Sequence, residues 1–365
     1  MNRPLTLFLC GDVMTGRGID QVLPHSCPPQ LYEPNATSAL DYVSLAERAH
    51  GPIPRPMAYA DLWGEALTVL EQTRPDARIV NLETSVTTSE EAEPKGINYR
   101  MHPGNVPVLA TAGIDCCVLA NNHVLDWGRE GLEETLRTLR RAGIRVAGAG
   151  ADLAAASAPA VVEPEGGGRV LVFGFGTDDS GIPGHWAAGP AQPGVRLLPN
   201  LSAGTVEEIA RQVAATRRPG DLVVASIHWG ANWGYDIPRA QRRFAQGLID
   251  AGAADAVHGH SSHHPKAIEI YRDRLILYGC GDFFNDYEGI GGHGDFRGDL
   301  VLMYLPAFDA TGRLTRLELA PLQVRGFRLR HPSPGDRAWL RRALDRECRR
   351  FGRHLVDRDD RFLLD

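Results

Sequence analysis

Short apolar runs recur along most of this chain, and they limit its possible folds more than any other feature. Each run is rich in Val, Ile and Leu and is only a few residues long, which is typical of a buried strand. Segments with helical periodicity separate several runs, at residues 59–72, 129–142, 206–216 and 239–251. Strands that alternate with helices predict an α/β fold with mainly parallel central strands. The predicted strands are residues 5–10, 78–82, 116–120, 170–175, 222–227, 267–271, 275–278 and 300–305.

The later predicted strands follow one another with little helix between them, which favours mixed sheets. We expect residues 1–330 to form a single catalytic domain. Residues 21–57 are rich in proline and follow the first strand, where an ordinary connection is short, so we expect an insertion over the site. Residues 331–365 combine many charges with a periodic stretch at 336–350, and we expect a C-terminal helical extension without an assigned function.

The bulk composition argues against two kinds of partner. A net charge of -6 does not suit a nucleic acid, which needs concentrated positive charge. No apolar segment reaches the roughly 20 residues of a membrane-spanning helix, and the first residues lack a signal-peptide pattern. We therefore expect a cytoplasmic protein with neither a nucleic acid nor a membrane as partner. The six cysteines contain no Cys-x-x-Cys pair and are expected to be reduced.

Polar residues with ligand chemistry stand where five of the apolar runs end, which is where open α/β sheets build their sites. A single Asp or His in such a place is usually a cap or a structural residue. Such residues at five successive strand ends are hard to explain by capping, and they predict a metal site. The five endings are Gly11-Asp12, Asn81 with Glu83, Asn121-Asn122-His123 with Asp126, His228-Trp229-Gly230, and His258-Gly259-His260 with His263.

In this order, the motifs Gly-Asp, Asn-x-Glu, Asn-Asn-His, His-Trp-Gly and Gly-His-x-x-His resemble the signature of CapA-like (poly-γ-glutamate synthesis) proteins. These proteins are a branch of the calcineurin-like metallophosphoesterases, and the resemblance covers most of the chain. It implies a calcineurin-like αββα sandwich of two mixed β-sheets flanked by helices, with the metal and the substrate at the strand carboxyl ends. Carried over by position, it implies the metal ligands Asp12, Glu83, Asn122, His228, His260 and His263.

The resemblance also implies that His123 acts on the substrate and that Asp126 orients it, because a carboxylate on one ring nitrogen fixes the tautomer. Two departures concern the metal. Met14 stands where phosphoesterases of this superfamily have the His of Asp-x-His, and Glu83 stands where they have a bridging Asp. The remaining oxygen ligands favour Ca²⁺, Mg²⁺ or Mn²⁺ over zinc, and one ion rather than two.

Further acidic and histidine residues suggest acid/base chemistry. Asp282 stands where the family has Asn, and a glycine-rich loop carries His293 and Asp295. Some soluble CapA-like proteins epimerise ribosomal peptides, lasso-peptide precursors among them. Inversion at a Cα needs a cation or strong donors for the enolate, plus a proton acceptor and a donor on opposite faces. His123 with Asp126 or Asp12, and His293 with Asp295 or Asp282, could supply them.

The leading hypothesis is therefore a metal-dependent cytosolic peptide epimerase, inverting a Cα near the C-terminus of a lasso-type precursor peptide. The alternatives are a metal-dependent phosphoesterase, a role in poly-γ-glutamate biosynthesis, and a binding module without turnover. The sequence leaves the oligomeric state open. The residues expected to bind the peptide are Arg17, Arg100, Lys266 and Arg297 for its carboxylate and Trp229 for an apolar side chain.

Overall fold

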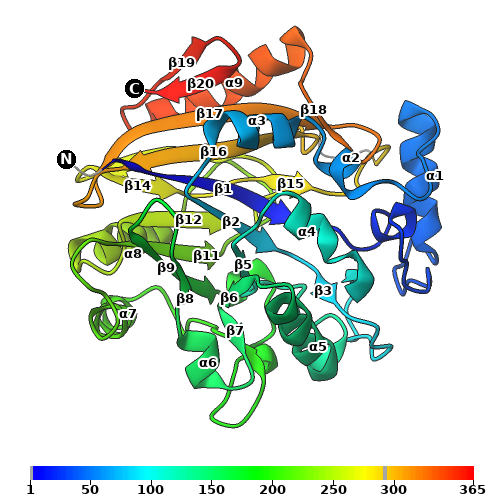
Figure 1. Ribbon diagram of the computed structural model, residues 1–365, viewed down its shortest axis with the longest axis horizontal. Coiled ribbons are helices and arrows are strands. Elements are labelled where there is room, and N and C mark those ends of the chain that lie inside the picture. Colours follow the sequence, from blue (N-terminus) through cyan, green and yellow to red (C-terminus); the bar gives the residue numbers. More distant parts are fainter. Residues whose placement is uncertain (1–2, 291–293) are drawn as a thin grey trace.

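Alternate side chains of the central strand β1 (Leu5–Val13) face two different hydrophobic cores. Leu7 and Leu9 lie in a core between two sheets, whereas Phe8 and Cys10 lie in a core beneath helices. This division follows from the two-residue period of a strand. The computed structural model describes residues 3–290 and 294–365. Its strands form two large mixed sheets, in which the same division of side chains between two cores recurs (Figure 1).

The two sheets differ in size. In the described residues, the larger sheet has ten strands, in the order β19 (Leu355–Arg358), β20 (Arg361–Leu364), β17 (Leu314–Val324), β16 (Leu300–Phe308), β1, β2 (Ala77–Leu82), β5 (Cys116–Val118) and β6 (Arg145–Ala147), with β15 (Asp282–Phe284) paired to β1 and β18 (Leu329–Arg330) paired to β17. The smaller sheet has six there, in the order β13 (Ile268–Tyr271), β14 (Arg274–Leu277), β12 (Ala256–His260), β11 (Asp221–His228), β9 (Arg169–Gly176) and β8 (Ala160–Val162). Short pairs join β3 (Ser85–Val86) to β4 (Arg100–Met101) and β7 (Ala149–Gly150) to β10 (Gly194–Val195).

Helices cover the outer faces of both sheets and give four layers. The core outside the larger sheet receives side chains from α2 (Tyr59–Trp63), α3 (Glu65–Thr73), α4 (Pro107–Thr111) and α5 (Gly128–Arg141). The core outside the smaller sheet receives them from α7 (Ala203–Ala214) and α8 (Arg239–Asp250). The remaining helices are α1 (Ala39–His50), α6 (Leu153–Ser157) and α9 (Pro334–Arg349). The predicted α/β sandwich of two mixed sheets is therefore confirmed.

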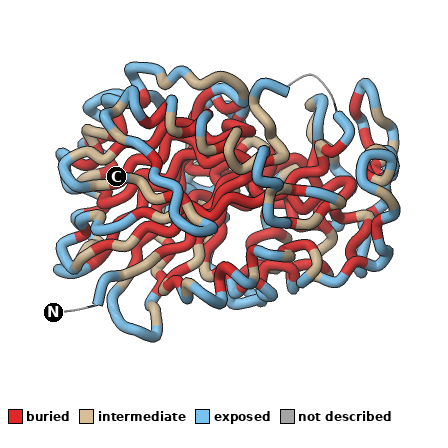
Figure 2. The backbone as a smooth tube through the Cα atoms, turned by 90° about the horizontal axis from the view of Figure 1, so that it is seen from above, coloured by how far each residue is buried: buried red, intermediate tan, exposed pale blue. Residues whose placement is uncertain are grey.

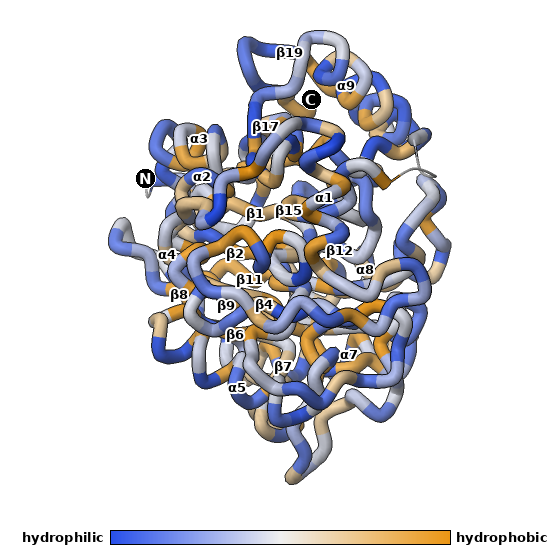
Figure 3. Tube along the Cα trace, turned by 90° about the vertical axis from the view of Figure 1, so that its right-hand side faces the viewer, coloured by the Kyte–Doolittle hydropathy of each residue, from blue (hydrophilic) through white to orange (hydrophobic). Residues whose placement is uncertain are grey.

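Burial and hydropathy follow these layers. Figure 2 shows buried segments running through the interior and exposed segments concentrated at the periphery. Figure 3 shows hydrophobic stretches of the central strands, β2 among them, enclosed by hydrophilic connections. The polar residues that follow these strands therefore lie where the hydrophobic core meets the connections.

Each predicted strand corresponds to an observed one, but one predicted helix is wrong as a single element. Residues 59–72 form two helices, α2 and α3, which are divided at Gly64. Gly64 has a φ of 47°, and a Cβ on it would lie 2.2 Å from the Leu329 carbonyl oxygen. Only glycine fits this contact, and the helix breaks there. The helical period of the sequence continues across the break, so the pattern does not reveal it.

The two segments predicted outside the regular fold are both tied to it. The proline-rich segment 21–57 contains α1, and the Met57 N–H donates to the Val22 carbonyl at 2.7 Å. The segment 331–365 contains α9 as expected, but it also contributes β19 and β20, which extend the larger sheet through β17. The domain boundaries stay predictions.

Within the described residues, none of the helices has the length and apolar character that crossing a bilayer requires.

The C-terminal hairpin allows a stability test of this arrangement. Phe362 is fully buried opposite Leu319 of β17, whereas Val356 on the same hairpin is 43% exposed. We expect Phe362→Ala to lower the free energy of unfolding by about 3–5 kcal/mol, through lost burial and a residual cavity. The control Val356→Ala should change it by less than about 0.5 kcal/mol. Urea unfolding followed by tryptophan fluorescence measures both, and equal effects would contradict an integral hairpin.

Candidate metal centre

Parallel strand pairs bring ligand-type side chains to one edge of the structure. In the larger sheet, Asp12 on β1 lies opposite Asn81 on β2 and Asp282 on β15. In the smaller sheet, His228 on β11 lies opposite His260 on β12. Because the strands within each pair run in the same direction, their carboxyl ends meet. The two sheets thus contribute carboxylates and imidazoles to one buried cluster.

Asp12 is fully buried and accepts two hydrogen bonds. Asn81 Nδ2 donates to its Oδ1 at 2.7 Å, and the Ser261 backbone N–H donates to its Oδ2 at 3.1 Å. Ser261 has a φ of 98°, a strained conformation for a residue with a side chain. Burial, followed by repulsion from Asp282, raises the pKa of Asp12 to about 7.

Glu83 follows β2 and is also buried. Its Oε1 lies 3.8 Å from His123 Nε2 and 3.9 Å from His228 Nε2, and its Oε2 has no hydrogen-bond partner within the described residues. Burial, then repulsion from Asp12 and Asp282, raises the pKa of Glu83 well above its ordinary value. An orphaned oxygen of this kind calls for a partner that the protein itself does not provide.

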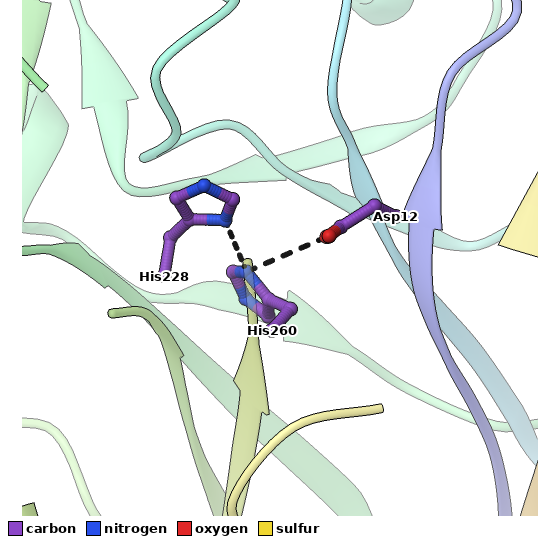
Figure 4. A group of neighbouring side chains, drawn as sticks. All are labelled: Asp12, His228 and His260. Carbon is purple, nitrogen blue, oxygen red and sulfur yellow. Dashed lines mark hydrogen bonds and ion pairs between the residues drawn. The ribbon is translucent and has the colours of Figure 1, made fainter. Parts of the chain in front are cut away.

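His228 and His260 face each other beside Asp12 (Figure 4). Their Nδ1 atoms are 2.8 Å apart, and His260 Nδ1 lies 3.9 Å from Asp12 Oδ1. Both rings are almost fully buried, and burial lowers the pKa of each well below its ordinary value. Neutral imidazole is the form that binds metals.

His263 and Asp282 form a second pair next to Asp12. His263 Nδ1 lies 2.7 Å from Asp282 Oδ1, and Asn285 Nδ2 donates to Asp282 Oδ2 at 2.8 Å. Burial opposes a charge on His263, but attraction from Asp282 and Asp12 outweighs it and raises the pKa of His263. Asp282 therefore pairs with His263, which the sequence placed among the metal ligands.

The donor set fits a divalent cation. Three carboxylates, from Asp12, Glu83 and Asp282, share a buried volume, and buried charge without compensation is costly. In the described part of the chain, two groups of possible ligands have atoms within 4.8 Å of one another, and Asp12 belongs to both; they are Asp12, His228 and His260, and Asp12, His263 and Asp282. Carboxylates suit Ca²⁺, Mg²⁺ or Mn²⁺, whereas imidazoles suit zinc and other transition metals. The expected preference over zinc and the expected single ion stay predictions.

His123 lies at the rim of this cluster and is held by Asp126. Its Nδ1 is 2.6 Å from Asp126 Oδ2, which also accepts the Tyr99 N–H at 2.6 Å. Burial lowers the pKa of His123 to about 4, with Lys95 adding to that effect and Asp126 opposing it. The ring is therefore neutral near pH 7, and its Nε2 points toward the Glu83 carboxylate.

Asn122 contacts one of the histidines. Its Oδ1 lies 2.9 Å from His228 Nε2, on the side of the ring away from His260. This contact orients the imidazole, as carboxylates and amides around metal sites commonly do. The role of Asn122 as a direct ligand stays a prediction.

Two of the arginines expected to bind a substrate carboxylate already bind carboxylates of the protein. Arg17 is buried and donates to Asp286 at 2.9 Å and to Glu33 at 2.9 Å. Arg297 donates to Asp299 and Asp336, each at 2.8 Å. The predicted use of these guanidinium groups by substrate has to compete with those ion pairs.

The other expected substrate-binding residues also have partners within the fold. Arg100 donates to the Ser89 carbonyl at 2.6 Å and lies over the Trp127 ring. Trp229 packs in the core outside the smaller sheet and donates to the Tyr278 carbonyl at 3.0 Å. Lys266 is buried, and burial lowers its pKa. Their roles in substrate binding stay predictions.

The predicted glycine-rich loop is only partly described. His293 lies outside the described residues. Asp295 is exposed, whereas Asp282, its predicted alternative, is buried in the cluster. Among the described residues, His263 with Asp282 forms a second His–carboxylate pair in the cluster. The predicted pair of His293 with Asp295 or Asp282 stays a prediction.

A cavity of about 820 Å³ lies beside His263. Its charged lining is paired within the protein: Arg17 with Glu33, Arg297 with Asp299, and Glu288 with His50 at 3.0 Å. Its other lining residues include Tyr42, Ile97, Trp233, Tyr287, Ile290 and Val324. The cavity thus offers mainly apolar and aromatic surface next to the cluster.

Sequence reasoning missed Lys95, whose Nζ donates to Asp126 Oδ1 at 2.7 Å and lies 3.4 Å from His123 Nδ1. It also hydrogen-bonds the Asn122 carbonyl oxygen. Lys95 belongs to an irregular polar segment, far from any strand end, so no periodic signal marks it. It named His258 in the same motif as His260 without assigning it a role, and it missed Ser226.

Comparison with known proteins places these motifs in context. Residues 6–287 match a family described as "Bacterial capsule synthesis protein PGA_cap". The chain is 49% identical over 362 residues to a probable polyglutamine synthesis accessory protein of Mycobacterium tuberculosis, covering 98% of this chain and 95% of that protein. It is 29% identical over 246 residues to the PGA biosynthesis protein CapA of Bacillus subtilis, covering 67% and 60%. It is 26% identical over 295 residues to the capsule biosynthesis protein CapA of Bacillus anthracis, covering 78% and 61%.

The cluster predicts how metal binding and stability respond to its carboxylates. Asp12→Asn and Glu83→Gln should each weaken Mn²⁺ binding at least about tenfold, because each removes a charged oxygen donor. The exposed Glu90→Gln variant should bind as the parent does. Isothermal titration calorimetry measures the affinities.

The melting temperature of the metal-free Asp12→Asn variant gives a second test. After treatment with a chelator, Asp12→Asn should melt at or above the temperature of the parent, since it removes a buried charge that burial and Asp282 disfavour. Differential scanning calorimetry measures this. A clearly lower melting temperature would mean that the carboxylate supports the fold rather than a cation.

Proposed function

Because the chain belongs to the PGA_cap family of bacterial capsule synthesis proteins, we propose that it is a divalent-metal-dependent enzyme that acts on an amide-linked chain of glutamyl or glutaminyl residues. The substrate class comes from the names of the relatives, and the reaction site from the buried cluster. The observation that carries the proposal is the His123–Asp126 pair, 2.6 Å apart and directly beside buried ligand-type residues. A cytoplasmic location and the lack of a nucleic-acid or membrane partner belong to the same proposal.

His123 would act as the proton acceptor. Its Nδ1–H donates to Asp126, which leaves Nε2 unprotonated and 3.8 Å from Glu83 Oε1, beyond hydrogen-bond distance. Lys95 neutralises part of the Asp126 charge and donates to Asp126 Oδ1, whereas His123 contacts Oδ2 of the same carboxylate. His263, whose pKa the neighbouring Asp282 raises, would act as the donor. General acid and base groups held in this way typically contribute about 10²–10⁴-fold to a rate.

The residues that would hold a cation are Asp12, Glu83, His228 and His260, with Asp282 and His263 next to them. A bound cation would supply positive charge for the negative charge that develops on a carbonyl oxygen. The apolar cavity beside His263 would exclude water and hold the neutral part of the substrate.

Peptide epimerisation at Cα is the second candidate, and the two His–carboxylate pairs favour it. Inversion needs a proton acceptor and a donor on opposite faces, and His123–Asp126 and His263–Asp282 each contact the Asp12 and Glu83 cluster from a different strand end. A ribosomal lasso-type peptide would be the substrate in that case. Phosphoester hydrolysis is the third, and Met14 in place of the phosphoesterase histidine weighs against it.

Three assays on the Mn²⁺-loaded protein separate these reactions. Poly-γ-glutamate of defined length is tested for chain shortening, a glutamate-rich peptide in deuterium oxide for deuterium at Cα, and a nitrophenyl phosphodiester for phenol release. The proposed function expects metal-dependent change of the glutamate chain alone. Exchange at Cα without cleavage would favour the epimerase, and phosphodiester turnover alone would overturn the proposal.

Replacing the proposed base should separate chemistry from metal binding. His123→Gln should lower kcat about 10²–10⁴-fold, because it removes the proton acceptor, while the Mn²⁺ content stays near that of the parent. The control His331→Gln alters a half-exposed histidine that pairs with Glu65, far along the chain from the cluster motifs. Turnover and metal analysis measure both. Loss of metal in His123→Gln would assign that ring to the metal instead.

Lys95 should set the protonation of His123. Its positive charge lowers the pKa of His123, so Lys95→Met should raise that pKa and shift protonation of the ring to higher pH. Lys95→Arg keeps the charge and should leave the pKa closer to that of the parent. Histidine NMR titration of the metal-free proteins gives the values. An unchanged pKa in Lys95→Met would show that Lys95 does not contribute to it.

A further inference from the structure

A buried hydrogen-bond chain leads from a backbone carbonyl of one sheet to a candidate metal ligand of the other. It begins at His258, which is fully buried on β12 with its Nε2 2.7 Å from the Cys10 carbonyl oxygen of β1. A carbonyl oxygen only accepts hydrogen bonds, so His258 Nε2 carries a proton. Within the described residues His258 forms no ion pair with a carboxylate, and a fully buried imidazolium without such a partner would be costly. The ring is therefore neutral, and its Nδ1 is an acceptor.

The Ser226 hydroxyl links the tautomer of His258 to the tautomer of His260. The Ser226 Oγ lies 3.0 Å from His258 Nδ1 and 2.9 Å from His260 Nε2. Because a hydroxyl has a single proton, and His258 Nδ1 takes it, the oxygen can only accept from His260. His260 Nε2 therefore carries the proton of that ring. His260 Nδ1 is left with a lone pair, directed toward His228 Nδ1 at 2.8 Å and Asp12 Oδ1 at 3.9 Å.

We propose that Ser226 and His258 are positioning residues that hold His260 in the tautomer whose Nδ1 can bind a divalent cation. Neither residue needs to touch the cation or the substrate. Their effect is to settle in advance which nitrogen of a buried ring is the ligand, so that no rearrangement of His260 is required on binding. This positioning role belongs to the metal centre itself and does not depend on which reaction the centre supports.

The tautomer of His228 is set by Asn122. Its Nε2 lies 2.9 Å from Asn122 Oδ1, which only accepts hydrogen bonds, so Nε2 carries the proton of the neutral ring. The Nδ1 lone pairs of His228 and His260 then face each other across 2.8 Å, next to Asp12. Both nitrogens can therefore bind a cation without a change of tautomer in either ring.

Nitrogen-15 NMR of the histidine rings tests the tautomers directly. In the wild-type protein, with or without the diamagnetic ions Mg²⁺ or Zn²⁺, His260 and His228 should each carry the ring proton on Nε2, and neither tautomer should change on binding. His260→Gln and His228→Gln samples assign the signals. A wild-type His260 protonated at Nδ1 would overturn the inference without recourse to any Ser226 or His258 variant.

Variants of Ser226 then test the positioning role. Ser226→Ala breaks the chain and should weaken Mn²⁺ binding about 10–100-fold, with loss of the single His260 tautomer. Ser226→Thr keeps the hydroxyl and should restore both properties. The control Ser180→Ala removes a buried hydroxyl that donates to the Thr177 carbonyl at 2.7 Å, and should change neither.

The outcomes of this comparison are distinct. Calorimetric titration gives the affinities, and thermal unfolding in the presence of a chelator shows whether each variant is folded. Unchanged affinity and tautomer in a folded Ser226→Ala protein would refute the proposal. If Ser226→Ala is unfolded, Ser226→Thr with lost tautomer selection would refute it as well.

Discussion

The carboxylates of Asp12, Glu83 and Asp282 are held out of water in a small volume, where like charges repel strongly. The surrounding structure meets this repulsion in several ways. Asn81 and the strained Ser261 donate to Asp12, Asn285 donates to Asp282, and His263 pairs with Asp282. One oxygen of Glu83 still has no partner in the described chain. A divalent cation would neutralise the negative charge that remains. The burial of these three carboxylates is therefore what makes the cluster a candidate metal site.

Residues at strand ends were predictable because their positions follow from local rules. A buried strand ends where its apolar run ends, and parallel neighbours align their carboxyl ends, so Asp12, Glu83, His228 and His260 converge as the sequence indicates. Contacts between segments without a period were not predictable. Arg17 reaches Asp286 across 269 residues, and Lys95 approaches His123 from an irregular segment. The sequence shows the charge of such residues but not their partners, which is why Arg17 was assigned to the substrate.

The fold itself shows the same division. The αββα layering was predicted through a family resemblance. The break at Gly64 was not, because it depends on close approach to the Leu329 carbonyl oxygen, 265 residues later in the sequence. For function, membership of the PGA_cap family gives the class of protein, and the buried cluster indicates metal chemistry. The reaction depends on what enters the cavity beside His263, where the pairing of nearby charges leaves apolar surface.

The terminal hairpin has a consequence for the solution behaviour of the chain. β17 is eleven residues long, and along part of its length β20 covers the edge that faces away from β16. An open edge of that length would offer backbone N–H and C=O groups to another chain. The outermost strand of the sheet is instead β19, four residues long and ending in Asp357 and Arg358. A short charged border strand resists the strand-to-strand association that begins aggregation, so the last residues of the protein protect its largest sheet.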